Sequence, residues 1–321
     1  MIVITGAAGF IGSCLVAELN QTGYKNLILV DDFTVESKRP NLAGKSFAHK
    51  IQRNDLWEWL DQNGDQVHTL FHIGARTDTA EQNWDVLTEL NVQYSRKIWA
   101  YACRYDIALC YASSAATYGD GSLGFSDDPD LIPKLNPLNP YGRSKQLVDQ
   151  WILTQEYTPR KWVGFKFFNV YGPNEYHKGR MASVIYHAFP QIRDEGHLRL
   201  FRSHREEFED GMQLRDFLYV RDLTAVLLEW MEHPRTNGIY NLGTGKARTF
   251  LDLGVSVFQA LEKETRISFF DIPQDIRAAY QYFTEADMHR FRKAGYVHRF
   301  KSLEQGSAEY VREFLLPGSR L

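Results

Sequence analysis

The stretch Thr5-Gly6-Ala7-Ala8-Gly9-Phe10-Ile11-Gly12 lies between a short β-branched run at 2–4 and apolar residues with helical spacing at 11–19. Its three glycines, Gly6, Gly9 and Gly12, permit a tight turn and let backbone N–H groups approach a phosphate at the positive end of a helix. A strand, a glycine turn and a helix in this order predict a dinucleotide-binding βαβ unit.

The chain around this turn alternates between apolar runs and helical patterns. Further strands are expected at 27–30, 70–73, 107–112, 162–168 and 239–242, a long helix at 86–105, and another from Pro140 to about Gln155. This alternation predicts an α/β fold with a Rossmann-type, doubly wound parallel sheet and a smaller C-terminal α/β substrate domain. We expect residues 1–168 to bind the dinucleotide and 169–321 to form mainly the substrate domain, with segments near 216–240 returning to the first.

Composition excludes several other classes of protein. The 321 residues carry 37 Lys and Arg against 40 Asp and Glu, so the basic excess typical of a nucleic-acid binder is absent. No apolar run reaches the roughly 18 residues that span a bilayer. The three cysteines are too few and too scattered for a disulfide scaffold or a zinc cluster, and we expect no metal site. A cytoplasmic protein without nucleic-acid or membrane partners is the expectation.

Acidic and basic residues after the second expected strand bear on the choice of cofactor. A carboxylate at Asp31 or Asp32 is placed to accept hydrogen bonds from ribose hydroxyls, which favours NAD. The cations Lys38, Arg39, Lys50 and Arg53 follow and could hold a 2′-phosphate, which favours NADP. We predict NADP held by Lys38 and Arg53, although the residues alone leave NAD open.

A tyrosine and a lysine share one face of the helix that Pro140 opens. Tyr141 and Lys145 are four residues apart, and a nearby ammonium is expected to lower the tyrosine pKa so that the phenolate acts as a base. Upstream, Ser113-Ser114 closes an expected strand, where a hydroxyl would face the cofactor crevice. Together with the glycine turn, these residues predict a dehydrogenase-type site.

The combined pattern resembles the extended short-chain dehydrogenase/reductase family, which acts on nucleotide-sugars. By motif, Ser114, Tyr141 and Lys145 match the catalytic triad of that family. The resemblance covers nearly the whole chain and includes the segments 71–75, 168–173, 215–217 and 241–245. It implies a nicotinamide cofactor, a nucleotide-sugar substrate and assembly into a homo-oligomer.

Ala115-Ala116 stands where dehydratases of the family carry an acid/base pair, so epimerisation or simple oxidation is favoured over elimination. Segments at 113–119, 177–184 and 280–287 resemble the heptose 6-epimerase branch of the family, which implies NADP and a role in making the lipopolysaccharide inner core. That branch brings a second candidate base, Lys178. Two bases suit a 6-epimerase because the hydroxyl lies on opposite sides in the two epimers.

The resemblance also implies binding residues outside the triad. The implied cofactor contacts are Gly6, Gly9, Phe10, Ile11, Gly12, Asp31, Asp32, Lys38, Arg53, Ile73, Gly74, Ala75, Asn91, Lys145, Val170 and Lys178. The implied substrate contacts are Ser114, Asn169, Arg180, His187, Phe201, Arg202, Ser203, His204, Arg215 and Tyr280.

Departures from the family pattern, among them Arg180 and the extra residues at 206–213, leave a related nucleotide-heptose or hexose open as the substrate. A 4-epimerase or reductase with NAD, or a catalytically silent nucleotide-binding scaffold, also remains an alternative.

Overall fold

A parallel sheet forms the centre of the computed structural model, which describes residues 1–233, 235–277 and 280–321. The sheet has seven strands in the order β11-β6-β5-β4-β1-β2-β3, and every neighbouring pair is parallel. This order confirms the predicted doubly wound sheet. The strands are β1 (Ile2–Thr5), β2 (Leu27–Asp31), β3 (His49–Gln52), β4 (Thr69–His72), β5 (Ala108–Ser114), β6 (Trp162–Phe167) and β11 (Gly238–Leu242).

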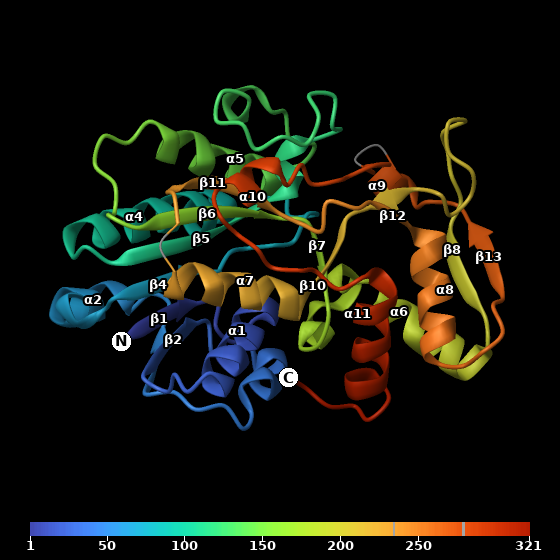
Figure 1. The fold of residues 1–321 in the computed structure, drawn as a ribbon, viewed down its shortest axis with the longest axis horizontal. Coiled ribbons are helices and arrows are strands. Elements are labelled where there is room, and N and C mark those ends of the chain that lie inside the picture. Colours follow the sequence, from blue (N-terminus) through green and yellow to red (C-terminus); the bar gives the residue numbers. More distant parts are fainter. Residues whose placement is uncertain (234, 278–279) are drawn as a thin grey trace.

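Helices cover both faces of this sheet, and that is why its central strands are continuous apolar runs (Figure 1). One face packs against α1 (Phe10–Gln21), α7 (Val220–Glu232) and α10 (His289–Lys293). The other packs against α2 (Leu56–Asn63), α4 (Tyr94–Arg104) and α5 (Pro140–Leu153). The two resulting cores fix the carboxyl ends of the strands relative to one another.

A second lobe lies beside the sheet, at the right of Figure 1. Its core is built around α6 (Val184–Pro190), α8 (Phe250–Ala260) and α11 (Leu303–Glu309). Its short sheets pair β7 (Asn169–Tyr171) with β10 (Phe217–Tyr219), β9 (Leu214–Arg215) with β12 (Arg248–Thr249), and β8 (Leu198–Phe201) with β13 (Ile267–Phe270). The short helices α3 (Trp84–Leu87) and α9 (Gln274–Arg277) complete the fold.

Most expected elements of the first half agree with the structure to within two residues. The expected long helix is α3 and α4 joined through a π-helical turn at Thr88–Gln93. The elements α7 and β11 belong to the main sheet layer, and α10 with Phe291 also joins that layer. The return of the C-terminal half to the first core is therefore longer than the expected segment near 216–240.

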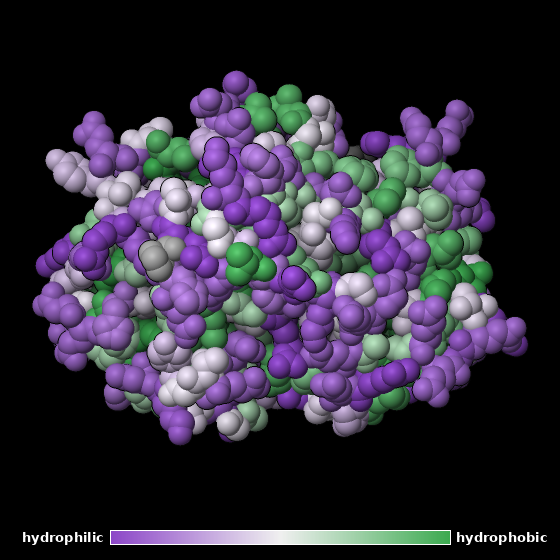
Figure 2. All heavy atoms as spheres, in the orientation of Figure 1, coloured by the Kyte–Doolittle hydropathy of each residue, from purple (hydrophilic) through white to green (hydrophobic). Residues whose placement is uncertain are grey.

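The face seen in Figure 2 is mostly polar, with apolar residues in small groups between charged ones. In the parts of the chain that the structure describes, no helix has the length and apolar character needed to cross a bilayer.

Candidate active site

The glycine turn packs directly against the loop that follows β4. Gly6 has a φ of 68°, and a Cβ there would lie 2.6 Å from the Cα of Gly74. A Cβ on Gly12 would lie 2.1 Å from the carbonyl oxygen of Gly6. Only glycine fits these positions, because any side chain would push the turn away from its neighbours. Phe10 then begins α1, so the free N–H groups of that helix open at the carboxyl edge of the sheet.

Asp31, at the end of β2, is buried and its two oxygens are bonded within the protein. One accepts from the Ala8 amide at 2.8 Å, and the other accepts from the Asp32 amide at 2.7 Å and the Lys38 ammonium at 2.9 Å. Sequence reasoning expected Asp31 to face ribose hydroxyls. In the structure its carboxylate holds the glycine turn and Lys38 in place, because a buried charge needs partners; its contact with a ribose stays a prediction.

A small hollow of about 180 Å³ lies beyond Asp31. It is lined in part by Asp32, Lys38, Arg39 and Lys50. Arg53, one of the two cations expected to hold a phosphate, lies outside this lining and pairs with Asp32 at 3.6 Å. The hollow therefore brings three cations close to two carboxylates, Asp32 and Glu36, and Arg39 pairs with Glu36 at 3.6 Å.

A larger cavity, of about 360 Å³, joins the glycine turn to the expected catalytic residues. It is bordered by the first residues of α1, the ends of β4 to β7, the start of α5 and the segment 178–184. All four residues expected to be catalytic, Ser114, Tyr141, Lys145 and Lys178, line it. So do the expected cofactor and substrate contacts Phe10, Ile11, Ile73, Ala75, Asn169 and Val170.

Ser114, Tyr141 and Lys145 reach the cavity from a strand end and the first turns of a helix. Asn139 caps α5 by accepting from the Gly142 amide at 2.8 Å, which fixes the turn that carries Tyr141. Burial raises the pKa of Tyr141, and a hydrogen bond with the Ser114 hydroxyl opposes that rise. Burial lowers the pKa of Lys145 to about 8, and its ammonium donates to the Ala112 carbonyl oxygen at 2.7 Å.

The expected lowering of the Tyr141 pKa by Lys145 is not met here. Burial disfavours the phenolate and dominates, while the Lys145 ammonium is bound to the end of β5.

Lys178 comes to the same cavity on a loop held by a buried carboxylate. Its ammonium lies 5.4 Å from the centroid of the Phe10 ring. Glu175 accepts from the Ser183 amide and hydroxyl, both at 2.6 Å, and from the Tyr310 hydroxyl at 3.0 Å. Burial lowers the pKa of Lys178, with Glu175 opposing the change, so the neutral amine is favoured relative to an exposed lysine.

Asn91 lies behind the cavity rather than in it. Its amide bonds the backbone of Arg76 in both directions, at 2.8 and 3.0 Å, and donates to the Ser144 hydroxyl at 2.9 Å. The residue therefore ties the loop after β4 to α5. Gly74, next to this loop, is held by the Thr5 hydroxyl at 3.1 Å.

Comparisons with known proteins agree with this geometry. The profile of the NAD dependent epimerase/dehydratase family matches residues 2–243. The chain belongs to that family. Membership confirms the family assignment made from the motifs and assigns a nicotinamide cofactor. The site fits such a cofactor, because one cavity is bordered by the N-terminus of α1, Tyr141 and Lys145.

Three individual proteins are similar over nearly their whole length. The ADP-L-glycero-D-manno-heptose-6-epimerase of Fusobacterium nucleatum is 42% identical over 98% of both chains. That of Nitratidesulfovibrio vulgaris is 45% identical, again over 98% of both. A crystal structure of the Helicobacter pylori enzyme of the same name superimposes with a TM-score of 0.79 at 26% identity, covering 97% of this chain and 95% of that one.

The remaining expected substrate contacts of this family member divide into two groups. Phe201, Arg215 and Tyr280 form one cluster in the C-terminal lobe, where the Tyr280 ring centroid lies 6.1 Å from that of Phe201 and 5.2 Å from the Arg215 guanidinium. Next to it, Asp210 accepts from Arg202 at 3.3 Å and from the Ser203 amide at 2.8 Å, and the His204 amide donates to the Tyr282 hydroxyl at 2.9 Å.

The second group lies away from this cluster. Arg180 and His187 are exposed and lie outside the cavity lining.

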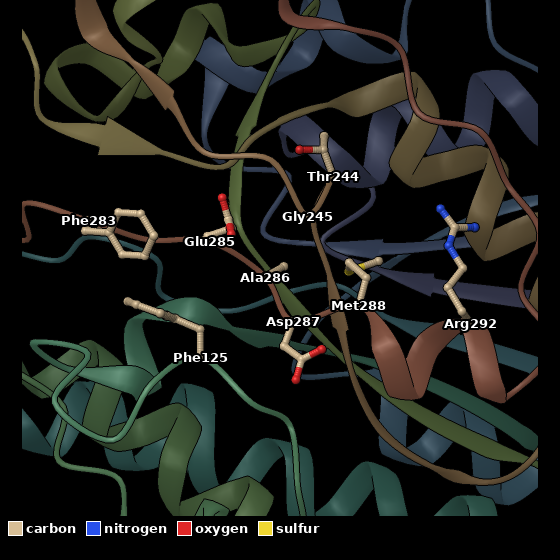
Figure 3. Close-up of a pocket in the computed structure, with 9 residues that line it drawn as sticks. All are labelled: Phe125, Thr244, Gly245, Phe283, Glu285, Ala286, Asp287, Met288 and Arg292. Carbon is tan, nitrogen blue, oxygen red and sulfur yellow. The ribbon is translucent and has the colours of Figure 1, made fainter.

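A separate hollow of about 530 Å³ contains none of the expected site residues (Figure 3). Phe125 and Phe283, with ring centroids 5.7 Å apart, lie at one end of it and Arg292 at the other. Behind it, the buried Asp216 accepts from the amides of Thr244, Gly245 and Ala286 at 2.8 to 3.1 Å. The 215–217 motif thus holds two loops together through Asp216.

Sequence reasoning missed several residues that complete the site. Thr77 and Thr79, and the apolar residues Phe217, Phe250 and Leu253, line the main cavity. Phe217 belongs to the 215–217 motif but was not expected at the site, and the other four residues come from segments whose spacing shows no link to the catalytic residues.

Proposed function

We propose that this enzyme interconverts ADP-D-glycero-D-manno-heptose and ADP-L-glycero-D-manno-heptose by transient oxidation at C6. The observation that carries the proposal is that two separate candidate bases, Tyr141 and Lys178, line the one cavity that Ser114 and the glycine turn also border. The two relatives that are 42% and 45% identical over 98% of the chain bear the name of this activity and support the choice of sugar and nucleotide.

In the proposed reaction each epimer presents its C6 hydroxyl to a different base. Tyr141 takes the proton from one epimer, and Lys178 takes it from the other; in each direction the second residue, in its protonated form, gives a proton to the oxygen when the ketone is reduced. Ser114 donates a hydrogen bond to the C6 oxygen. Lys145 lies beside Tyr141 as a cation. The N-terminus of α1, with Tyr141 and Lys145, would hold the nicotinamide, which would supply a reversible hydride acceptor for C6, so that the hydride can return to the opposite face of the ketone. Lys178 must be neutral to act as a base, and its burial favours that form.

The cofactor we propose is NADP rather than NAD. The support is the hollow of about 180 Å³ beyond Asp31, in which Lys38, Arg39 and Lys50 lie close together. Guanidinium and ammonium groups bind phosphate through charge-assisted hydrogen bonds, each worth about 1.5–3 kcal/mol. Lys38 pairs with the buried Asp31, whereas the partner of Arg39, Glu36 at 3.6 Å, is exposed, so we change Arg39 and Lys50.

Titrations of the nucleotides with Arg39→Gln/Lys50→Gln test the cofactor proposal. We expect NADP affinity to fall by about 10- to 100-fold per lost contact and NAD affinity to stay near its original value. Arg160→Gln, an exposed cation on the opposite edge of the sheet, is the control. A separate Arg53→Gln variant tests whether Arg53, outside the hollow, binds the phosphate in place of Arg39 and Lys50. Equal losses of NAD and NADP affinity in the double variant would show that these cations do not read the phosphate.

Incubation of the enzyme with a panel of nucleotide-sugars, with products resolved by NMR, tests the reaction itself. We expect inversion at C6 of the ADP-heptoses and no inversion at C4 of UDP-hexoses. Inversion at C4, or net reduction with release of oxidised cofactor, would replace the proposal by a 4-epimerase or a reductase. A homo-oligomeric assembly and a cytoplasmic location stay predictions of the sequence.

A further inference from the structure

A buried ion pair lies beneath the candidate catalytic residues, and neither of its members lines the cavity. Asp149 on α5 and Lys166 on β6 are both 0% exposed, and the Lys166 ammonium lies 2.6 Å from the Asp149 carboxylate. Asp149 follows Lys145 by one helical turn and Tyr141 by two, so the three lie along one side of α5. A charge buried this deeply is costly unless it is fully paired and hydrogen-bonded.

The pair joins every element that carries a candidate catalytic residue of the triad. Asp149 also accepts from the Ser113 hydroxyl at 2.6 Å and from the Tyr111 hydroxyl at 3.0 Å, both on β5. Lys166 donates to the Thr117 hydroxyl at 2.8 Å, in the 3₁₀ turn η4 (Ala115–Tyr118) that follows Ser114. The Ser113 hydroxyl is thereby bonded to α5 through Asp149, while its neighbour Ser114 bonds Tyr141.

We propose that the Asp149–Lys166 ion pair is the positioning device of the site: it fixes α5 against β5 and β6 so that Tyr141 and Lys145 face Ser114, and it places a carboxylate one helical turn from Lys145. The proposal rests on the proposed epimerase function only where kcat is measured with ADP-heptose. Asp149 and Lys166 are positioning residues, since they act through Tyr141 and Lys145.

The surroundings of the pair determine how its removal changes the site. The titratable groups that face Asp149 are Tyr111 on β5, Tyr118 on η4, Lys166 on β6, and Tyr141 and Lys145 on α5; His72 on β4 faces Lys145. Among these charges, Asp149 raises the pKa of both Lys145 and Tyr141. Without the carboxylate charge, both pKa values should fall.

The test uses Asp149→Asn, which keeps the shape of the side chain, and Asp149→Asn/Lys166→Met, which leaves no unpaired charge. We expect the double variant to fold, to bind the cofactor, and to epimerise ADP-heptose with kcat reduced by about 10- to 100-fold at nearly unchanged KM, because small displacements of reacting groups cost rate. Both limbs of its pH–rate profile should move to lower pH.

The matched control is Asp127→Asn. Asp127 is also a fully buried carboxylate, bonded to the Asn241 amide at 2.7 Å and lying 3.5 Å from Arg290, but it is not among the charges that act on Tyr141 or Lys145. We expect that variant to lose stability without displacement of the pH–rate profile.

A substrate-free measurement separates this proposal from the proposed function. With ring-labelled tyrosine, the NMR signal that disappears in Tyr141→Phe reports the ionisation of Tyr141, and we expect its midpoint at lower pH in both pair variants. An unchanged midpoint with unchanged kcat would overturn the proposal, and so would failure of both variants to fold, since the pair would then serve folding alone. If wild-type protein fails to epimerise ADP-heptose while the midpoint moves as expected, the proposed function fails and the positioning role stands.

Discussion

At the residue scale, the phenol oxygen of Tyr141 is the group whose removal should matter most. Tyr141→Phe keeps the ring and deletes the oxygen that the Ser114 hydroxyl bonds. We expect activity to fall by about 10² to 10⁴, as is usual when a general base is lost, with fold and cofactor binding intact. Steady-state rates, thermal unfolding and cofactor titration of the variant check this.

Tyr101→Phe is the matched control, because its hydroxyl bonds Asp61 on an exposed surface at 3.1 Å. Wild-type turnover in folded Tyr141→Phe would contradict the assignment of the base.

Individual residues show what the sequence could and could not predict about the site. Ser114, Tyr141 and Lys145 are recognisable because each sits at a fixed place in a strand or helix, and the fold brings those places together. The pairing of Asp149 with Lys166 has no such signal, since it depends on the register of β5 with β6 and on the packing of α5 against β5. Likewise, one of the bonds that occupy Asp31 comes from Ala8, in a turn 23 residues earlier in the chain.

At the scale of the element, a change in the first turn of α5 should alter kcat. Asn139→Ala removes the side chain that accepts from the Gly142 amide, next to Tyr141. We expect a loss of about 1 kcal/mol in the free energy of unfolding, the usual cost of an N-cap. We also expect kcat to fall by roughly 10-fold, because the turn that orients Tyr141 loosens. Denaturant titration and turnover measurements check both effects.

Ser302→Ala supplies the comparison, since Ser302 caps α11 in the other lobe by accepting from the Gln305 amide at 3.2 Å, and α11 does not line the cavity. It should lose similar stability and keep a higher kcat than Asn139→Ala. Equal falls in kcat would mean that activity follows overall stability and not the geometry of α5.

Elements of the first half could be predicted because each strand is an apolar run and each helix has regular spacing. The C-terminal lobe could not, because its strands are short and pair across long separations. β8 at Leu198–Phe201, for example, pairs with β13 at Ile267–Phe270. Neither strand alternates clearly enough to predict the other, and the pairing depends on α8 packing beneath them.

At the scale of the whole molecule, a buried histidine should make stability depend on pH. His72 bonds the hydroxyls of Thr5 and Ser95 at 2.7 and 2.9 Å, and burial lowers its pKa from 6.5 to about 3. Between these values the unfolded chain binds a proton that the folded chain does not. The contribution of His72 to the free energy of unfolding should therefore fall as pH falls below 6.5, by at most about 1.4 kcal/mol per pH unit.

Urea unfolding of the wild type and of His72→Gln between pH 4 and 7 isolates this effect. The comparison is needed because burial raises the pKa of Glu175 and Asp216, and those carboxyls change stability in the opposite direction. The difference between the two proteins should shrink as the pH falls. A difference that stays constant with pH would show that His72 titrates normally in the folded protein.

The central claim is that Tyr141 and Lys178 serve opposite epimers within one cavity, and reduction of the bound cofactor on mixing with each pure epimer tests it most directly. The wild type should reduce its cofactor with either epimer, and absorbance near 340 nm follows that step. Lys178→Met should retain the step with one epimer only, and Tyr141→Phe with the other only, while neither variant interconverts the two at a normal rate. If Lys178→Met reduces its cofactor with both epimers and epimerises at the wild-type rate, a single base suffices and the two-base account is wrong.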